Sequence, residues 1–160
     1  MRHIISCLVR NKPGVLAQIA GLISSRGFNI DSFTGGETER PEYSSLTLVT
    51  TGDDRQVAHI VKQLRKLIDT IRVEDITATH PVERDLALIK VSAPPRKRQE
   101  IYSMVDVFRG KIVDIGLRNM VIEISGPEAK VDAFLELLTP YGIQETIRTG
   151  RIAMVRGRKR

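Results

Sequence analysis

The chain of 160 residues is 41% hydrophobic, 4% aromatic and free of tryptophan, and its formal net charge is +6. This length suits one large domain or two small ones around an aliphatic core. The chain has no run of about 18 apolar residues that could cross a membrane, and its start, MRHIISCLVR, lacks the apolar region and cleavage site of a signal peptide. The single cysteine, Cys7, excludes an internal disulfide and a cysteine-rich metal site. We therefore expect a cytoplasmic protein.

The first half of the chain predicts the element order β-α-β-β-α-β. Strands are expected at 3–10, 28–37, 43–51 and 70–78, because these segments are rich in β-branched and apolar residues. Helices are expected between the first two strands and between the last two, where apolar residues recur at helical spacing. These residues are Val15, Leu16, Ile19, Leu22 and Ile23 in the first helix, and Val57, Ile60, Val61, Leu64 and Ile68 in the second. Gly27 is placed to end the first helix and Asp53 to cap the second.

The polar segment HPVERD at 80–85 is the predicted domain boundary, because a similar pattern of elements restarts after it. The expected strands are 85–93, 111–117, 119–126, 143–150 and 151–157. One helix is expected to open at PPRKR and another at Pro127. The second half therefore repeats the order β-α-β-β-α-β and adds a final strand.

This order predicts an α+β fold of two consecutive ferredoxin-like βαββαβ sandwiches, at 1–79 and 80–160. In each, two helices cover one face of a four-stranded antiparallel sheet. Exposed strand edges invite pairing with another chain, so we expect a homodimer.

Residues able to catalyse a reaction are scarce. The three histidines, His3, His59 and His80, lie far apart in sequence without metal-ligand spacing or a neighbouring nucleophile motif. Cys7 lies in the middle of an apolar strand with no recognisable general base. No GxxxxGK[ST] or GxGxxG motif is present. We predict no catalytic residue, no metal site and no cofactor in this chain.

The basic balance raises the alternative of nucleic-acid binding. Ferredoxin-like sheets bind RNA through aromatic residues on central strands, and the expected central strands lack the spaced aromatic pair. The terminal RGRKR is interpreted as a solvated end rather than a specific contact. We do not expect a nucleic-acid partner.

The segment NKPGVLAQIAGLISSRGFNIDS at 11–32 is the candidate binding site. The first turn of a helix has free N–H groups that favour a carboxylate, and Gly14 would let a ligand approach the backbone of Val15 and Leu16. Asn11 can cap the helix or accept from an ammonium group, and Asn29 offers a further amide oxygen. Together with the apolar Leu16 and Ile30, these residues fit a free aliphatic amino acid. The same letters also suit an ordinary turn into a helix, so both interpretations stay open.

At these residues the sequence resembles the ACT domain, a ferredoxin-like module that binds amino acids. A longer series of motifs resembles a narrower family, the small regulatory subunit of acetolactate synthase. The motifs are N-x-x-G-x-L at 11–16, RGFNIDS at 26–32, QLRKLIDTIRV at 63–73, VERDLALIKV at 82–91, VFRGKIVDIG at 107–116 and RTGRIAMVRG at 148–157.

The resemblance implies a regulator without catalytic activity of its own. Its partner would be a catalytic large subunit that uses thiamine diphosphate, magnesium and FAD to join two 2-ketoacids. The small subunit would activate that partner and confer feedback inhibition by a branched-chain amino acid, with valine expected. Asn11, Gly14, Val15 and Leu16 of one chain would face Asn29 and Ile30 of a second chain across the ligand. The second domain would contact the catalytic subunit.

Two features depart from the family pattern. Ser44-Ser45 stands where many members have Ser-Arg, and Gly35-Gly36-Glu37 with Pro41 gives the strand connection its own sequence. The alternative function is a free-standing ACT regulator that responds to amino acids. In that alternative, nucleic acid is a candidate partner.

Overall fold

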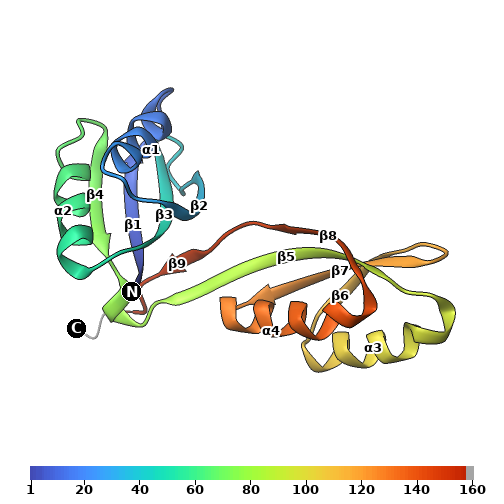
Figure 1. The fold of residues 1–160 in the computed structure, drawn as a ribbon. Coiled ribbons are helices and arrows are strands. Elements are labelled where there is room, and N and C mark those ends of the chain that lie inside the picture. Colours follow the sequence, from blue (N-terminus) through green and yellow to red (C-terminus); the bar gives the residue numbers. More distant parts are fainter. Residues whose placement is uncertain (158–160) are drawn as a thin grey trace. The chain divides into compact units, whose positions relative to one another are not determined.

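The computed structural model describes residues 1–157, which form two compact units (Figure 1). The first unit is Met1–Val82 together with the described residues from Arg151 onward, and the second is Glu83–Gly150. Within residues 1–157, no helix is long and apolar enough to cross a membrane.

The first unit has the predicted order of elements. These are β1 (Arg2–Arg10), α1 (Val15–Ser25), β2 (Ile30–Glu37), β3 (Tyr43–Thr51), α2 (Asp54–Leu64) and β4 (Thr70–Asp75), followed by a 3-10 turn at Thr77–Thr79. The strands form an antiparallel sheet in the order β2-β3-β1-β4, which leaves β2 and β4 at its edges.

Both helices cover one face of this sheet, as Figure 1 shows. Alternate residues of each strand point to that face, so Ile5, Cys7 and Val9 of β1 pack with Leu46 and Leu48 of β3. The helices close the core with residues at helical spacing, namely Val15, Ile19 and Ile23 of α1 and Val57, Ile60, Val61 and Leu64 of α2.

The ends of the two helices follow local rules. Asp53 caps α2 by accepting from the N–H of Gln56, whose side chain accepts from the N–H of Asp53. Gly27, with φ of 75°, lies just beyond α1 in the left-handed region that terminates helices. One prediction was wrong: α2 ends at Leu64, so Ile68 lies outside the helix and is 86% exposed.

The second unit repeats the order. Its elements are β5 (Val82–Ser92), a 3-10 turn at Pro95–Lys97, α3 (Arg98–Val107), β6 (Lys111–Ile115), β7 (Asn119–Gly126), α4 (Glu128–Leu138), a 3-10 turn at Thr139–Tyr141 and β8 (Ile143–Arg148). The sheet order is β6-β7-β5-β8, equivalent to that of the first unit. Ile89 and Ile122 on the covered face pack with Ile101 of α3 and Phe134 of α4.

The final strand, β9 (Ile152–Met154), groups with the first unit, whereas the sequence placed residues 80–160 together. Hydrogen bonds from the backbone of this segment to side-chain hydroxyls of the first unit accompany this grouping. The N–H of Arg151 donates to the Ser32 hydroxyl at 2.9 Å, and that of Ala153 donates to the Thr47 hydroxyl at 3.4 Å. The predicted solvated tail RGRKR extends over Arg156 and Gly157, and its last three residues lie outside the described range.

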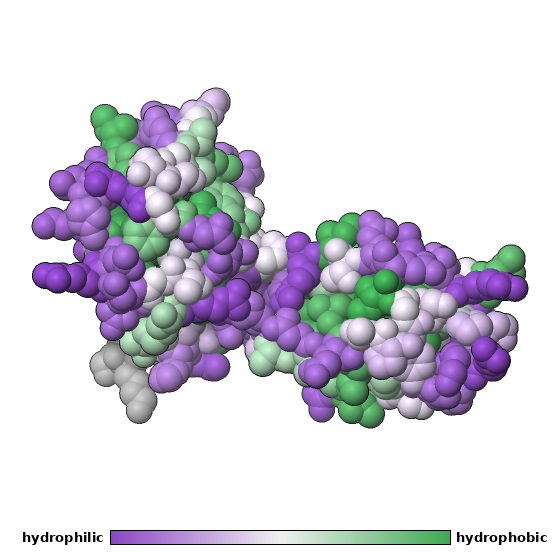
Figure 2. All heavy atoms as spheres, viewed as in Figure 1, coloured by the Kyte–Doolittle hydropathy of each residue, from purple (hydrophilic) through white to green (hydrophobic). Residues whose placement is uncertain are grey.

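Figure 2 shows that hydrophilic residues cover most of the visible face and that hydrophobic ones gather in separate patches on each unit. The α+β fold predicted from the sequence, with two ferredoxin-like units, is confirmed.

Candidate functional site

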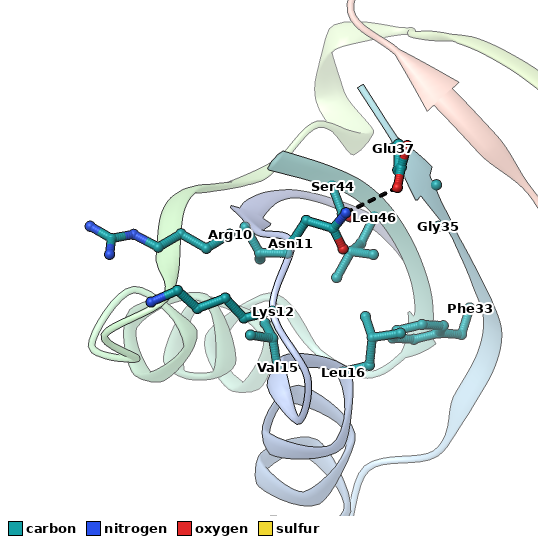
Figure 3. A pocket seen from close by; sticks show the side chains of 12 residues that line it. Arg10, Asn11, Lys12, Val15, Leu16, Phe33, Gly35, Glu37, Ser44 and Leu46 are labelled. Atoms are coloured by element: carbon teal, nitrogen blue, oxygen red, sulfur yellow. Dashed lines mark hydrogen bonds between the residues drawn. The ribbon is translucent and has the colours of Figure 1, made fainter. Parts of the chain in front are cut away.

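A cavity of about 420 Å³ lies at the start of α1 in the first unit (Figure 3). The loop between β1 and α1 and the covered faces of β2 and β3 enclose it. Its lining residues are Val9, Arg10, Asn11, Lys12, Val15, Leu16, Phe33, Gly35, Gly36, Glu37, Ser44 and Leu46.

Backbone N–H groups are free at the start of α1. Gly14 is the N-cap, with φ of 86°, and no side chain caps the helix. The Val15 N–H donates to the carbonyl of Lys12 at 3.4 Å, while those of Gly14 and Leu16 have no acceptor within residues 1–157. Such groups, at the positive end of the helix dipole, favour an anionic oxygen.

Asn11 has a different role from the predicted helix cap. Its amide nitrogen donates to Glu37 Oε1 at 3.1 Å and to the carbonyl oxygen of Pro41 at 3.0 Å. Asn11 thus joins the loop before α1 to the connection between β2 and β3. Its amide oxygen, on the other side of the same group, is left to accept from a donor in the cavity.

The cavity has an apolar side and a polar side. Leu16, which is 49% exposed, and Phe33 lie together on the apolar side, and Asn11, Ser44 and Glu37 form the polar side (Figure 3). A molecule with both a charged end and a short aliphatic end matches this division.

Two cations at the rim are directed elsewhere. Figure 3 shows the side chains of Arg10 and Lys12 extending away from Glu37 and Phe33. The Lys12 ammonium lies 3.7 Å from Asp69 Oδ1, so it forms an ion pair with the loop before β4.

Within one chain, four of the six predicted site residues lie at the cavity and two lie outside it. Asn11, Val15 and Leu16 line the cavity, and Gly14 begins the helix beside it. Asn29 and Ile30 are not among the lining residues. The Asn29 amide nitrogen donates to Asp31 Oδ1 at 3.0 Å, and its backbone oxygen accepts from the Thr50 hydroxyl at 2.7 Å. Their contribution from a second chain stays a prediction.

Sequence reasoning missed Glu37, Ser44 and Phe33 as lining residues. Phe33 and Glu37 lie four residues apart in a strand, so strand alternation places both on the face that bears the helices. This alternation was the signal available in the sequence. The contact between Asn11 and Glu37 was not, because it spans 26 residues.

Cys7 and His3, which were considered for catalysis, are buried in the first unit. Burial raises the pKa of the Cys7 thiol to about 12, so the thiol stays protonated at neutral pH. His3 is buried, and its Nδ1 lies 2.8 Å from Asp75 Oδ2. In the described part of the chain, no group of three or more His, Cys, Asp or Glu side chains could hold a metal ion.

Comparison with known proteins first defines the class. Residues 5–72 match the family model of the AHAS small subunit-like ACT domain, and residues 84–157 match that of the small subunit of acetolactate synthase. The first unit is thus an ACT domain, and the second is the C-terminal part characteristic of one regulatory family.

Whole-length relatives identify the family. The chain is 53% identical to a probable acetolactate synthase small subunit of Archaeoglobus fulgidus, over 100% of both chains. It is 48% identical to an acetolactate synthase small subunit of Aquifex aeolicus, over 97% of this chain and 81% of the relative. The crystal structure of the acetolactate synthase small subunit of Thermotoga maritima matches with a TM-score of 0.90 and 43% identity, covering 99% of each chain.

The chain belongs to the acetolactate synthase small subunit family, which confirms the resemblance seen in its motifs. This membership supports a regulatory role and implies a catalytic large subunit as partner.

Proposed function

We propose that this chain activates the catalytic subunit of acetolactate synthase and makes it subject to feedback inhibition by a branched-chain amino acid, with valine the expected effector. The cavity at the start of α1 is the observation that carries the proposal, because it combines free N–H groups, amide and carboxylate oxygens and an apolar wall. In this arrangement the 2-ketoacid condensation and its cofactors, thiamine diphosphate, magnesium and FAD, belong to the catalytic subunit.

The chemistry of each side of the cavity suggests the orientation of the effector. Its carboxylate would accept from the free Leu16 N–H at the start of α1. Its ammonium group would lie on the polar side, near the Asn11 amide oxygen, and its aliphatic side chain would pack on Leu16 and Phe33. The choice among valine, leucine and isoleucine rests on differences of about 1–3 kcal/mol in such a pocket.

A second copy of the chain would complete the site. β2 is an edge strand of its sheet, and edge strands pair readily with another chain. Leu16 is half exposed, and Asn29 and Ile30 lie outside the cavity of their own chain. In a homodimer, Asn29 and Ile30 of one protomer would close the cavity of its partner.

Feedback then requires that the effector bind one state of the assembly more tightly than another. A ligand held between two protomers would bias their relative orientation and thereby the way the dimer acts on the catalytic subunit.

The test is co-purification of the chain with a catalytic subunit from the same source, followed by assay of acetolactate formation from pyruvate with and without valine. We expect a stable complex, higher turnover than that of the catalytic subunit alone, and loss of the added turnover with valine. Valine binding without association or activation would support the alternative of a free-standing regulator. Acetolactate formation by the purified chain alone would contradict a non-catalytic role.

A further inference from the structure

Glu37 is the only acidic residue among those that line the cavity at the start of α1. We propose that its carboxylate, with the amide oxygen of Asn11, binds the ammonium group of the amino-acid effector. This inference rests on the proposed function, and it explains part of the Gly35-Gly36-Glu37 sequence that departs from the family pattern.

The strand places Glu37 on the cavity side. Phe33, Gly35 and Glu37 alternate along β2, so they share the face that the helices cover. Gly35 lies opposite Leu46 of β3, and a Cβ atom at Gly35 would come within 2.4 Å of Leu46 Cδ2. Leu46 therefore fills the space beside Gly35, and on this face of β2 only a residue without a side chain fits between Phe33 and Glu37.

A hydrogen bond orients the carboxylate. Asn11 donates to Glu37 Oε1 at 3.1 Å (Figure 3), which leaves Oε2 and the second lone pair of Oε1 for another donor. The carbonyl oxygen of Pro41 takes the other proton of the Asn11 amide at 3.0 Å. Both amide protons are thus engaged, and the Asn11 oxygen and the Glu37 carboxylate together offer acceptors to an ammonium group.

The nearby cations do not neutralise this carboxylate. Arg10 and Lys12 also line the cavity, but their side chains leave it on the side away from Glu37 (Figure 3). Lys12 lies beside Asp69 at 3.7 Å. The polar side of the cavity therefore has one negative charge available for a cationic ligand group.

The consequence is discrimination between amino acids and acids that lack the amine. Valine brings an ammonium group to Glu37, whereas 2-hydroxyisovalerate brings a neutral hydroxyl of similar size. A charge-assisted hydrogen bond is roughly twice as strong as a neutral one, so the carboxylate favours valine.

The experiment compares valine and 2-hydroxyisovalerate binding to the full-length chain by ligand-observed NMR titration, which detects weak as well as tight binding. Glu37→Gln keeps the shape and the acceptor for Asn11 but removes the charge. Glu39→Gln is the matched control, because Glu39 is exposed in the same connection, does not line this cavity and gives the same change in net charge. Thermal unfolding of both variants checks that they are folded.

We expect Glu37→Gln to weaken valine binding about tenfold and to leave 2-hydroxyisovalerate binding unchanged. Glu39→Gln should change neither. If Glu37→Gln binds valine as the unmodified chain does, or weakens both ligands by the same factor, the inference is overturned while the proposed function stands. If the unmodified chain does not bind valine, the effector site itself is wrong and the inference is lost with it.

Discussion

The two units share one order of elements, but the side chains at the start of their first helix differ in length and in hydrogen bonding. In the first unit, the short side chain of Asn11 joins the loop before α1 to Glu37 and Pro41 and leaves a cavity beside it. In the second, Arg98 is the first residue of α3, and its long side chain lies at the start of that helix. Its guanidinium donates to the carbonyl oxygens of Ala93 at 3.0 Å, Gly116 at 2.6 Å and Leu117 at 2.9 Å.

The difference leaves the start of α1 open and closes the start of α3 with side-chain hydrogen bonds. Arg98 links the strand before α3 to the connection between β6 and β7 and satisfies three carbonyl groups. Glu100 extends this region by accepting from Tyr141 at 2.7 Å and pairing with Lys97 at 3.2 Å. Asn11 makes the corresponding link with only two hydrogen bonds and leaves Leu16 and the helix start accessible.

The largest expected effect comes from placing a carboxylate at the open helix start. Gly14→Asp should weaken valine binding at least about 100-fold, because the new charge would lie where the carboxylate of valine is expected. A Cβ atom at Gly14 meets nothing within 4 Å, so the side chain itself has room. Isothermal titration calorimetry with valine measures the loss.

Gly14→Asn is the matched control for this variant. Both substitutions carry the strain of the φ of 86°, about 1 kcal/mol, but only aspartate adds the charge. Equal valine affinity in the two variants would show that backbone strain, and not repulsion, causes the effect.

The next effect tests the closed helix start of the second unit. Arg98→Ala should lower the free energy of unfolding by about 2 kcal/mol, since hydrogen bonds from a charged donor contribute about 1.5–3 kcal/mol and this side chain is partly exposed. Urea unfolding followed by circular dichroism measures it. Arg96→Ala, on the exposed turn just before α3, should change stability by less than about 0.5 kcal/mol. Similar losses in the two variants would contradict a structural role specific to Arg98.

A smaller loss of stability is expected when Asn11, before the open start of α1, is replaced. Asn11→Ala removes two exposed hydrogen bonds and should lower the free energy of unfolding by about 1 kcal/mol or less. Valine affinity should fall about fivefold, as the amide oxygen is lost and Glu37 is no longer oriented. An unchanged affinity in calorimetry would remove Asn11 from the site.

The smallest effect concerns the acid stability of the first unit. Burial opposes ionisation of Asp75, but hydrogen bonds from the Thr77 hydroxyl and N–H, together with His3, lower its pKa below 3.8. A lowered folded-state pKa stabilises the fold above the unfolded value, and this stabilisation is lost as pH falls through the folded value.

Asp75→Asn should therefore lower the free energy of unfolding by about 0.5 kcal/mol above pH ~5, with allowance for solvent screening. The difference in stability between this variant and the unmodified chain should shrink below pH ~3.8. Urea unfolding across this range measures it, with Glu74→Gln on the same strand as control. A difference between Asp75→Asn and the unmodified chain that stays constant down to the lowest pH would contradict the assignment.

The sequence was sufficient for features that local rules govern. Hydrophobic spacing located both helices of the first unit, and Asp53 and Gly27 marked a start and an end. Ile68 misled, because its spacing continued that of α2 after the helix had ended at Leu64. The grouping of β9 with the first unit depends on hydrogen bonds to Ser32 and Thr47, which lie more than 100 residues away in sequence.

The candidate site shows the same division. Gly14 and Leu16 were predicted from the chemistry of a helix start, which is local. The contacts of Glu37 and Pro41 with Asn11 could not be predicted from the sequence. They depend on the register of β2 and β3, which brings the connection between these strands beside Asn11.

The most direct test of the central claim is a crystal structure of the full-length chain grown with valine. We predict the amino acid in the cavity of the first unit, with its carboxylate at the N–H of Leu16 and its ammonium group beside Asn11 and Glu37. Valine bound in the second unit, or in the first unit away from the start of α1, would contradict the account.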